Sequence, residues 1–152
     1  MGDGAERQHN ERNAASRERL RTTLDRLSAE SLDRQVDGEW TAGALLAHLA
    51  FWDRLVVGRW RLAARHHAPA PPDLHDEIAD LVNDAALSAW RSIDAVRLRV
   101  LVLSAADEID QFIEDLSDAS VDAAIAADRP RLVDRSFHRA EHLDTIDAAL
   151  GS

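Results

Sequence analysis

The chain contains no cysteine, no lysine and no tyrosine, and it has no long hydrophobic run. Without cysteine the protein has no disulfide, no thiol nucleophile of its own and no thiolate metal ligand. No apolar segment approaches the ~20 residues that a membrane-spanning helix needs, so we predict no membrane partner. The polar start MGDGAERQHN lacks the apolar core of a signal peptide, and we expect a cytoplasmic protein.

Positive charge is supplied by arginine alone. All 18 basic residues are Arg, against 28 acidic residues, which gives a formal net charge of −10. Because phosphate backbones repel a chain this acidic, we expect a small-molecule substrate and no nucleic-acid partner.

The apolar periodicity is helical throughout. A length of 152 residues predicts a single domain over residues 10–152, after a disordered lead-in over residues 1–9. Helices are predicted over about 11–29, 41–65, 84–116 and 130–150, with a short turn at 76–81. The run VRLRVLVL is interpreted as part of the third helix, because helical patterns flank it on both sides.

Threonine and proline mark where some of these helices begin and end. Thr41 is a good N-cap for the second helix, and Pro130 suits the first turn of the fourth. Three prolines in HHAPAPPDL end the second helix. The predicted fold class is therefore all-α, a four-helix bundle with a Pro-rich crossover after the second helix.

The segment FHRAEHLDTID carries two histidines one turn apart, His138 and His142, which project about 40° from each other on a helix. His48 also borders an apolar stripe, on the second helix, about 40° from Trp52. If these helices are neighbours, three imidazoles converge with one coordination position open, which is typical of catalytic metal sites. A histidine pair on a helix is a weak signal, and a hydrogen-bonded core histidine is the alternative interpretation of His48.

Two arginines of the fourth helix, Arg135 and Arg139, project toward its apolar sector. Either residue can hold an anionic substrate through a bidentate pair. The alternative is that both are surface residues whose stems cover apolar area.

The segment GEWTAGALLAHLAFWDRL resembles the second-helix entry of the DinB/YfiT-like superfamily. In that family a Trp precedes a Ser or Thr helix cap, a His-Leu pair follows on an apolar face, and an Asp lies one turn beyond. The corresponding residues are Trp40, Thr41, His48, Leu49 and Asp53.

The family's fourth helix carries His-x-x-x-His followed by aliphatic residues, which is similar to His138, His142, Leu143 and Ile146. VNDAALSAW also looks like this group. The resemblance implies a four-helix bundle, often a homodimer. It also implies a divalent ion, commonly zinc or nickel, held by His48, His138 and His142.

Some relatives use a low-molecular-weight thiol, and mycothiol-dependent maleylpyruvate isomerase is similar in this metal-binding bundle. That isomerase has a Glu at the position of His138. The function that the resemblance implies is a metal-dependent enzyme using a mycothiol-like thiol for transfer or isomerisation. A metal-dependent hydrolase and a non-catalytic, metal- or ligand-binding dimeric bundle are the alternatives. No general base stands out, since Asp53 projects about 140° from His48.

Overall fold

The computed structural model describes residues 3–151, and these residues are mostly helical. In chain order the elements are α1 (Asp3–Arg26), α2 (Ala29–Leu32), β1 (Gln35–Asp37), β2 (Trp40–Thr41), α3 (Ala42–Arg65), α4 (Asp76–Arg91), α5 (Ala95–Glu114), α6 (Asp118–Ala126), the 3₁₀ turn η1 (Pro130–Leu132) and α7 (Ser136–Leu150). No helix within residues 3–151 is long and apolar enough to cross a bilayer.

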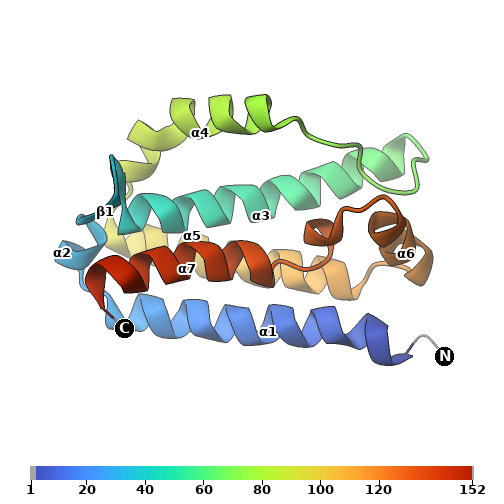
Figure 1. Cartoon of the computed structure of the whole chain (residues 1–152), viewed down its shortest axis with the longest axis horizontal. Helices are drawn as coiled ribbons and strands as arrows, with labels where there is room; N and C mark the ends of the chain where they lie inside the picture. The colour runs from blue at the N-terminus through green and yellow to red at the C-terminus, as the bar shows by residue number, and fades with distance from the viewer. Residues whose placement is uncertain (1–2, 152) are drawn as a thin grey trace.

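The long helices α1, α3, α5 and α7 lie side by side, and α4 covers the outside of α3 (Figure 1). α3 packs on α5 and α7, while α1 packs on α5 and α7. The proline-containing segment 66–75 joins the far end of α3 to the start of α4. This arrangement is all-α and places the second and fourth predicted helices, α3 and α7, next to each other.

Two groups of buried apolar residues hold these helices together. The larger one joins α1, α3, α5 and α7, with Leu24, Leu46, Leu98 and Ile146 among its members. The smaller one lies toward α6, where Trp60 of α3 packs against Ile109, Ile113, Val121 and Leu132. The Trp60 indole also donates a hydrogen bond to the Leu132 carbonyl at 3.1 Å. The distance between α3 and the start of α7 is therefore set by packing on both sides of the histidines.

The second helix is confirmed as predicted. Thr41 is its N-cap, and its hydroxyl accepts a hydrogen bond from the Ala44 amide at 3.0 Å. A short hairpin of β1 and β2 precedes it, which the sequence did not predict. Gly38 makes the hairpin turn with a φ of +54°, a conformation that glycine adopts without steric cost.

The predicted third helix is wrong in its extent, although VRLRVLVL is helical. Residues 84–116 do not form one helix, because α4 ends at Arg91 and α5 begins at Ala95. The Asp94 carboxylate accepts a hydrogen bond from the Arg97 amide and so caps a new helix. The predicted turn at 76–81 is the first part of α4. α6, which the sequence did not predict, begins at its N-cap Ser117.

The fourth helix begins later than the predicted range of 130–150. Pro130 begins the 3₁₀ turn η1, and α7 starts only at Ser136. The Asn13 side chain of α1 holds the break, since it donates to the Val133 carbonyl and accepts from the Arg135 amide. A tertiary contact thus decides where α7 begins.

The disordered lead-in predicted over residues 1–9 differs from the structure, in which α1 begins at Asp3. His9 is buried, 5% exposed. Residues 1 and 2 lie outside the described residues. The first helical turns carry little apolar periodicity, so no local signal predicted them.

Candidate metal centre

His48 lies in the second turn of α3 and is 6% exposed. Three tryptophans surround its ring, with centroid distances of 5.5 Å to Trp40, 5.5 Å to Trp90 and 6.1 Å to Trp52. These aromatic rings displace water from one side of the imidazole. The other side faces α7.

His138 and His142 of α7 complete a group of three imidazoles. Their ring centroids lie 4.8 Å apart, and they lie 5.0 and 4.7 Å from the centroid of His48. One ring nitrogen from each of the three lies within 4.8 Å of the others. The structure therefore brings together the three histidines that the sequence singled out.

The spacing of these nitrogens suits a metal ion. Nε2 of His48 and Nε2 of His138 are 3.1 Å apart. Two imidazole nitrogens held by one tetrahedral zinc ion at its usual bond length are about 3.3 Å apart. The same 3.1 Å also fits a hydrogen bond between the two rings. Imidazole nitrogens are good ligands for zinc and nickel, so the residues present fit a divalent ion.

Asn83 of α4 determines which nitrogen of His48 carries the proton. The Trp52 indole N–H, which can only donate, lies 2.9 Å from Asn83 Oδ1. The same oxygen lies 3.1 Å from Nδ1 of His48, so Nδ1 must be the donor. The neutral imidazole then has its lone pair on Nε2, which points toward His138. The sequence did not identify Asn83, because nothing local distinguishes it from other polar residues of its helix.

Burial keeps all three imidazoles neutral. Loss of water is the largest effect in each case, and it lowers the pKa of His48 to about 4. Burial also lowers the pKa of His142. The pKa of His138 is lowered first by burial and then by the positive charge of Arg135. Only neutral imidazole binds a metal ion, so these shifts keep the ligands competent near neutral pH.

Arg135 lies directly beside this group. Its Nε donates to the Asp53 carboxylate at 2.9 Å, and one Nη lies 3.2 Å from Nδ1 of His138. Its other Nη donates to the Arg131 carbonyl at 2.8 Å. The residue is 4% exposed and is one of the residues that line two clefts.

Arg139 is not brought to a cleft. It is fully buried, and its two Nη atoms donate to both oxygens of Asp110 at 3.0 and 2.8 Å. A second carboxylate, Asp53, lies at 3.5 Å. This position corrects the prediction that Arg139 binds an anionic substrate, because the guanidinium is already held inside the protein. The interpretation as a surface residue is wrong as well.

Asp53 does not face the histidine group, in agreement with its projection on α3. Together with Asp110 it balances the charges of Arg135 and Arg139 inside the protein. Sequence reasoning missed these pairs. The only local signal was the presence of charged residues on apolar faces, which does not identify their partners.

Two clefts reach the histidines from outside. One of about 530 Å³ is lined by all three histidines together with Trp52, Asn83 and Arg135. A second of about 280 Å³ reaches His48 and His142 beside Trp40. The larger cleft lies within the range of small-molecule sites, which is about 300–1,000 Å³.

Comparison with known protein families identifies the family of the chain. A family model described as the DinB superfamily matches residues 12–143, which includes all three histidines. The chain belongs to the DinB superfamily. Comparisons with curated proteins and with solved structures gave no match.

Proposed function

We propose that this protein is a metal-dependent enzyme in which His48, His138 and His142 hold one divalent ion, zinc or nickel. The observation that carries the proposal is the convergence of three neutral imidazoles, from two helices, with ring nitrogens within 4.8 Å. Membership of the DinB superfamily supports it. In this proposal α1, α3, α5 and α7 form a four-helix bundle, with residues 66–75 as its crossover.

The reaction we propose is transfer or isomerisation that uses a low-molecular-weight, mycothiol-like thiol as cosubstrate. A divalent ion with three neutral ligands and an open position lowers the pKa of a bound thiol or water. The chain has no cysteine, so the thiol has to come from a small molecule. The cleft of about 530 Å³ beside the histidines has room for such a molecule.

The surrounding residues have distinct parts in this proposal. Asn83 orients His48 by accepting its Nδ1–H, and the tryptophans exclude water from that ring. Arg135 places a positive charge in the lining of the cleft, where it attracts the anionic part of a substrate. The ion pair with Asp53 holds that guanidinium in position.

Metal content is the first test. Tag-free protein is analysed by elemental mass spectrometry after loading with zinc or nickel, beside a His138→Ala/His142→Ala variant. We expect about one ion per chain in the wild type and none in the variant. A matched control replaces the exposed pair His66 and His75 with Ala and should keep its ion. A wild type that binds no ion overturns the proposal.

The thiol is tested on protein loaded with Co²⁺, whose visible absorption reports its ligands. Adding a small thiol should change the absorption, because its thiolate would bind at the coordination position that the three histidines leave free. No change with any thiol, together with hydrolysis of test esters or amides, would favour a metal-dependent hydrolase instead. Bound metal without either activity would favour a non-catalytic metal-binding protein.

We also propose that the protein is a homodimer. An apolar groove of about 350 Å³ is bordered by α3, the end of α4 and α5, and is lined by Phe51, Leu55, Trp90 and Leu101 among others. Burying such a face against a second copy removes apolar surface from water. Light scattering should give twice the chain mass for the wild type and the chain mass for Phe51→Glu. Ile125→Glu, at an exposed position on α6, is the control and should remain a dimer.

A further inference from the structure

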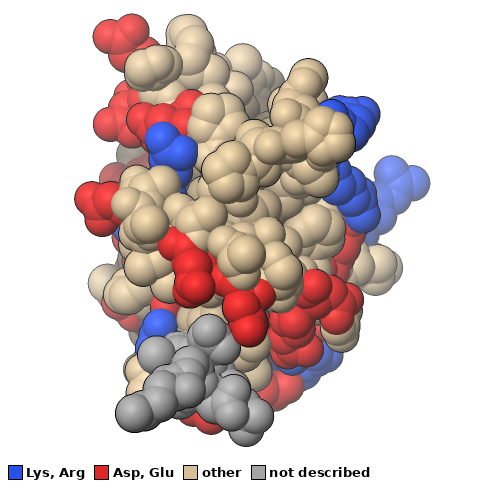
Figure 2. All heavy atoms as spheres, turned by 90° about the vertical axis from the view of Figure 1, so that its right-hand side faces the viewer, with Lys and Arg blue, Asp and Glu red and all other residues tan. Residues whose placement is uncertain are grey.

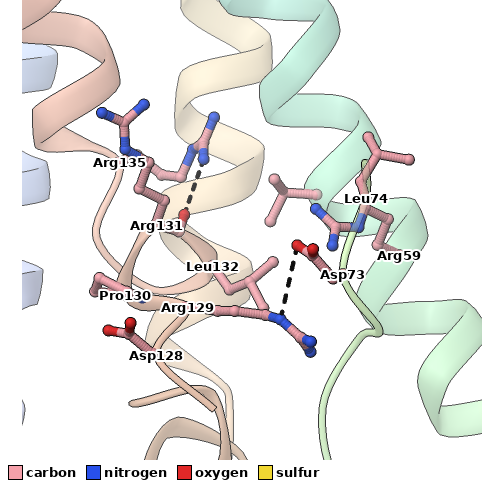
Figure 3. Close-up of a pocket in the computed structure, with 10 residues that line it drawn as sticks. Arg59, Asp73, Leu74, Asp128, Arg129, Pro130, Arg131, Leu132 and Arg135 are labelled. Atoms are coloured by element: carbon pink, nitrogen blue, oxygen red, sulfur yellow. Dashed lines mark hydrogen bonds and ion pairs between the residues drawn. The ribbon is translucent and has the colours of Figure 1, made fainter. Parts of the chain in front are cut away.

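A third cleft, of about 430 Å³, lies beside the candidate metal centre and is rich in arginine (Figure 3). Its charged lining residues are Arg59, Arg129, Arg131, Arg135, Asp73 and Asp128. They come from α3, from the linker 66–75 and from the segment that leads into α7. In Figure 3, Arg59 and Asp73 lie on one side of the cleft and Arg131 and Arg135 on the other.

The charge of this cleft is opposite to that of the chain. Four arginines face two aspartates here, whereas the whole chain has 18 basic and 28 acidic residues. On the end of the molecule shown in Figure 2, uncharged residues cover most of the surface, and acidic side chains are more prominent than basic ones. A local excess of positive charge inside a concave site attracts anions.

Arg59 is the least compensated of these cations. Arg129, Arg131 and Arg135 each have a carboxylate within 4.0 Å, whereas among the described residues Arg59 has none. Its Nη2 donates a hydrogen bond to the Pro72 carbonyl at 2.6 Å. The pKa of Arg59 is lowered, first by burial and then by the positive charge of Arg129. A half-buried guanidinium without a full countercharge has N–H donors available for a ligand.

Arg129 is held in a similar way. Its Nη1 donates to the Pro71 carbonyl at 2.7 Å, and its Nε lies 4.0 Å from the exposed carboxylate of Asp73. Two successive prolines thus present their carbonyls to two guanidiniums. Because proline has a restricted backbone, the linker already holds both guanidiniums in place. A ligand that binds them therefore loses little free energy in ordering these two side chains.

The arginine cleft is continuous with the cleft that contains the histidines. Val56, Arg59, Arg131 and Arg135 line both of them. An extended small molecule with one end in the arginine cleft would therefore have its other end near His138. The histidine cleft itself is balanced in charge, since Asp76, Asp80 and Glu141 offset its three arginines.

We propose that the arginine cleft binds an oxyanion, a carboxylate or phosphate group, through the guanidiniums of Arg59 and Arg129. This inference rests on the proposed function. It assigns the substrate class as an extended small anion whose charged end lies away from the atom that reacts. Guanidinium binds both oxyanions through paired N–H donors, so the chemistry is shared.

The test uses titration calorimetry at low ionic strength, with inorganic phosphate and with succinate as the two probes. We expect saturable binding of at least one probe by the wild type, and the tighter probe identifies the preferred oxyanion. Arg59→Gln and Arg129→Gln should each weaken it by about tenfold or more. Arg97→Gln, which removes an arginine 85% exposed on α5, is the matched control and should bind like the wild type.

Circular dichroism checks that each variant is folded. If Arg59→Gln does not fold, Arg59→Lys is tested in its place. Lysine keeps the charge and loses the paired donors, so partial loss of affinity supports the proposal. Absence of saturable binding in the wild type overturns it, as does equal weakening in Arg97→Gln.

The His138→Ala/His142→Ala variant separates this inference from the proposed function. If it binds the probe like the wild type, the oxyanion site stands without the metal. A protein that takes up zinc but neither probe refutes the oxyanion site and leaves the proposed function intact. A protein that binds a probe but no metal refutes the proposed function and leaves the oxyanion site.

Discussion

The guanidinium of Arg135 lies 3.2 Å from Nδ1 of His138, on the side of the ring away from His48. Guanidinium can only donate, so Nδ1 accepts and neutral His138 carries its proton on Nε2. That proton lies between His138 and the Nε2 of His48, 3.1 Å away. A hydrogen-bonded chain therefore runs from Arg135 through both imidazoles to Asn83, and an ion bound between the imidazoles has to replace its central proton.

Arg135→Gln is expected to tighten zinc binding, on the order of tenfold. The substitution removes a positive charge beside the ion and the hydrogen bond that favours the competing proton on His138 Nε2. Affinity is measured by competition with a chelator of known strength. Arg54→Gln, an exposed arginine of α3, should leave the affinity unchanged. Weaker zinc binding in Arg135→Gln would contradict this interpretation of the contact.

Asn83→Ala is expected to weaken zinc binding by about 10- to 100-fold, because His48 loses the acceptor that fixes its tautomer. Asn83→Asp should recover most of the affinity, since a carboxylate accepts from both His48 and Trp52. The same chelator competition measures both variants. Equal affinities for Asn83→Ala and the wild type would show that Asn83 does not orient His48.

The stability of the metal-free protein should fall as the pH is lowered from about 6.5 to about 4. The pKa of His48 is about 4 in the folded protein and about 6.5 in the unfolded chain, so in this window the unfolded state binds more protons. Above this window His48 is neutral in both states and contributes no pH dependence. His138 and His142 shift in the same direction.

From His48 alone the loss is about 2 kcal/mol between neutral pH and about pH 5. Urea unfolding at the two pH values measures it. His48→Gln, which does not titrate, should show a smaller loss than the wild type. An equal loss in the variant would assign the pH dependence to other groups.

Asp53→Asn should lower the free energy of unfolding by about 3–5 kcal/mol, because it leaves two buried guanidiniums short of negative charge. Asp25→Asn removes a carboxylate that pairs with Arg99 at the surface at 2.6 Å, and should cost less than about 1 kcal/mol. Urea unfolding at neutral pH compares the two. Similar losses would mean that the buried network contributes no more than an exposed pair.

Local patterns predicted the elements whose ends are set by their own residues. Thr41 caps its helix because its hydroxyl accepts a hydrogen bond from the Ala44 amide, three residues further on. The helix that follows continues to Arg65. Helical geometry likewise placed His138 beside His142 and put His48 at the edge of an apolar face. These relationships depend on neighbours within one or two turns, which a sequence displays directly.

Contacts between distant residues decided the rest. The start of α7 depends on Asn13, which is more than a hundred residues away. Arg139 is internal because Asp110 and Asp53, on two other helices, offset its charge. The sequence by itself determined the all-α class and which helix faces carry histidine. Only the tertiary structure decided that these faces meet beside Asn83 and an arginine cleft, because packing between helices, and not periodicity within them, selects the partners.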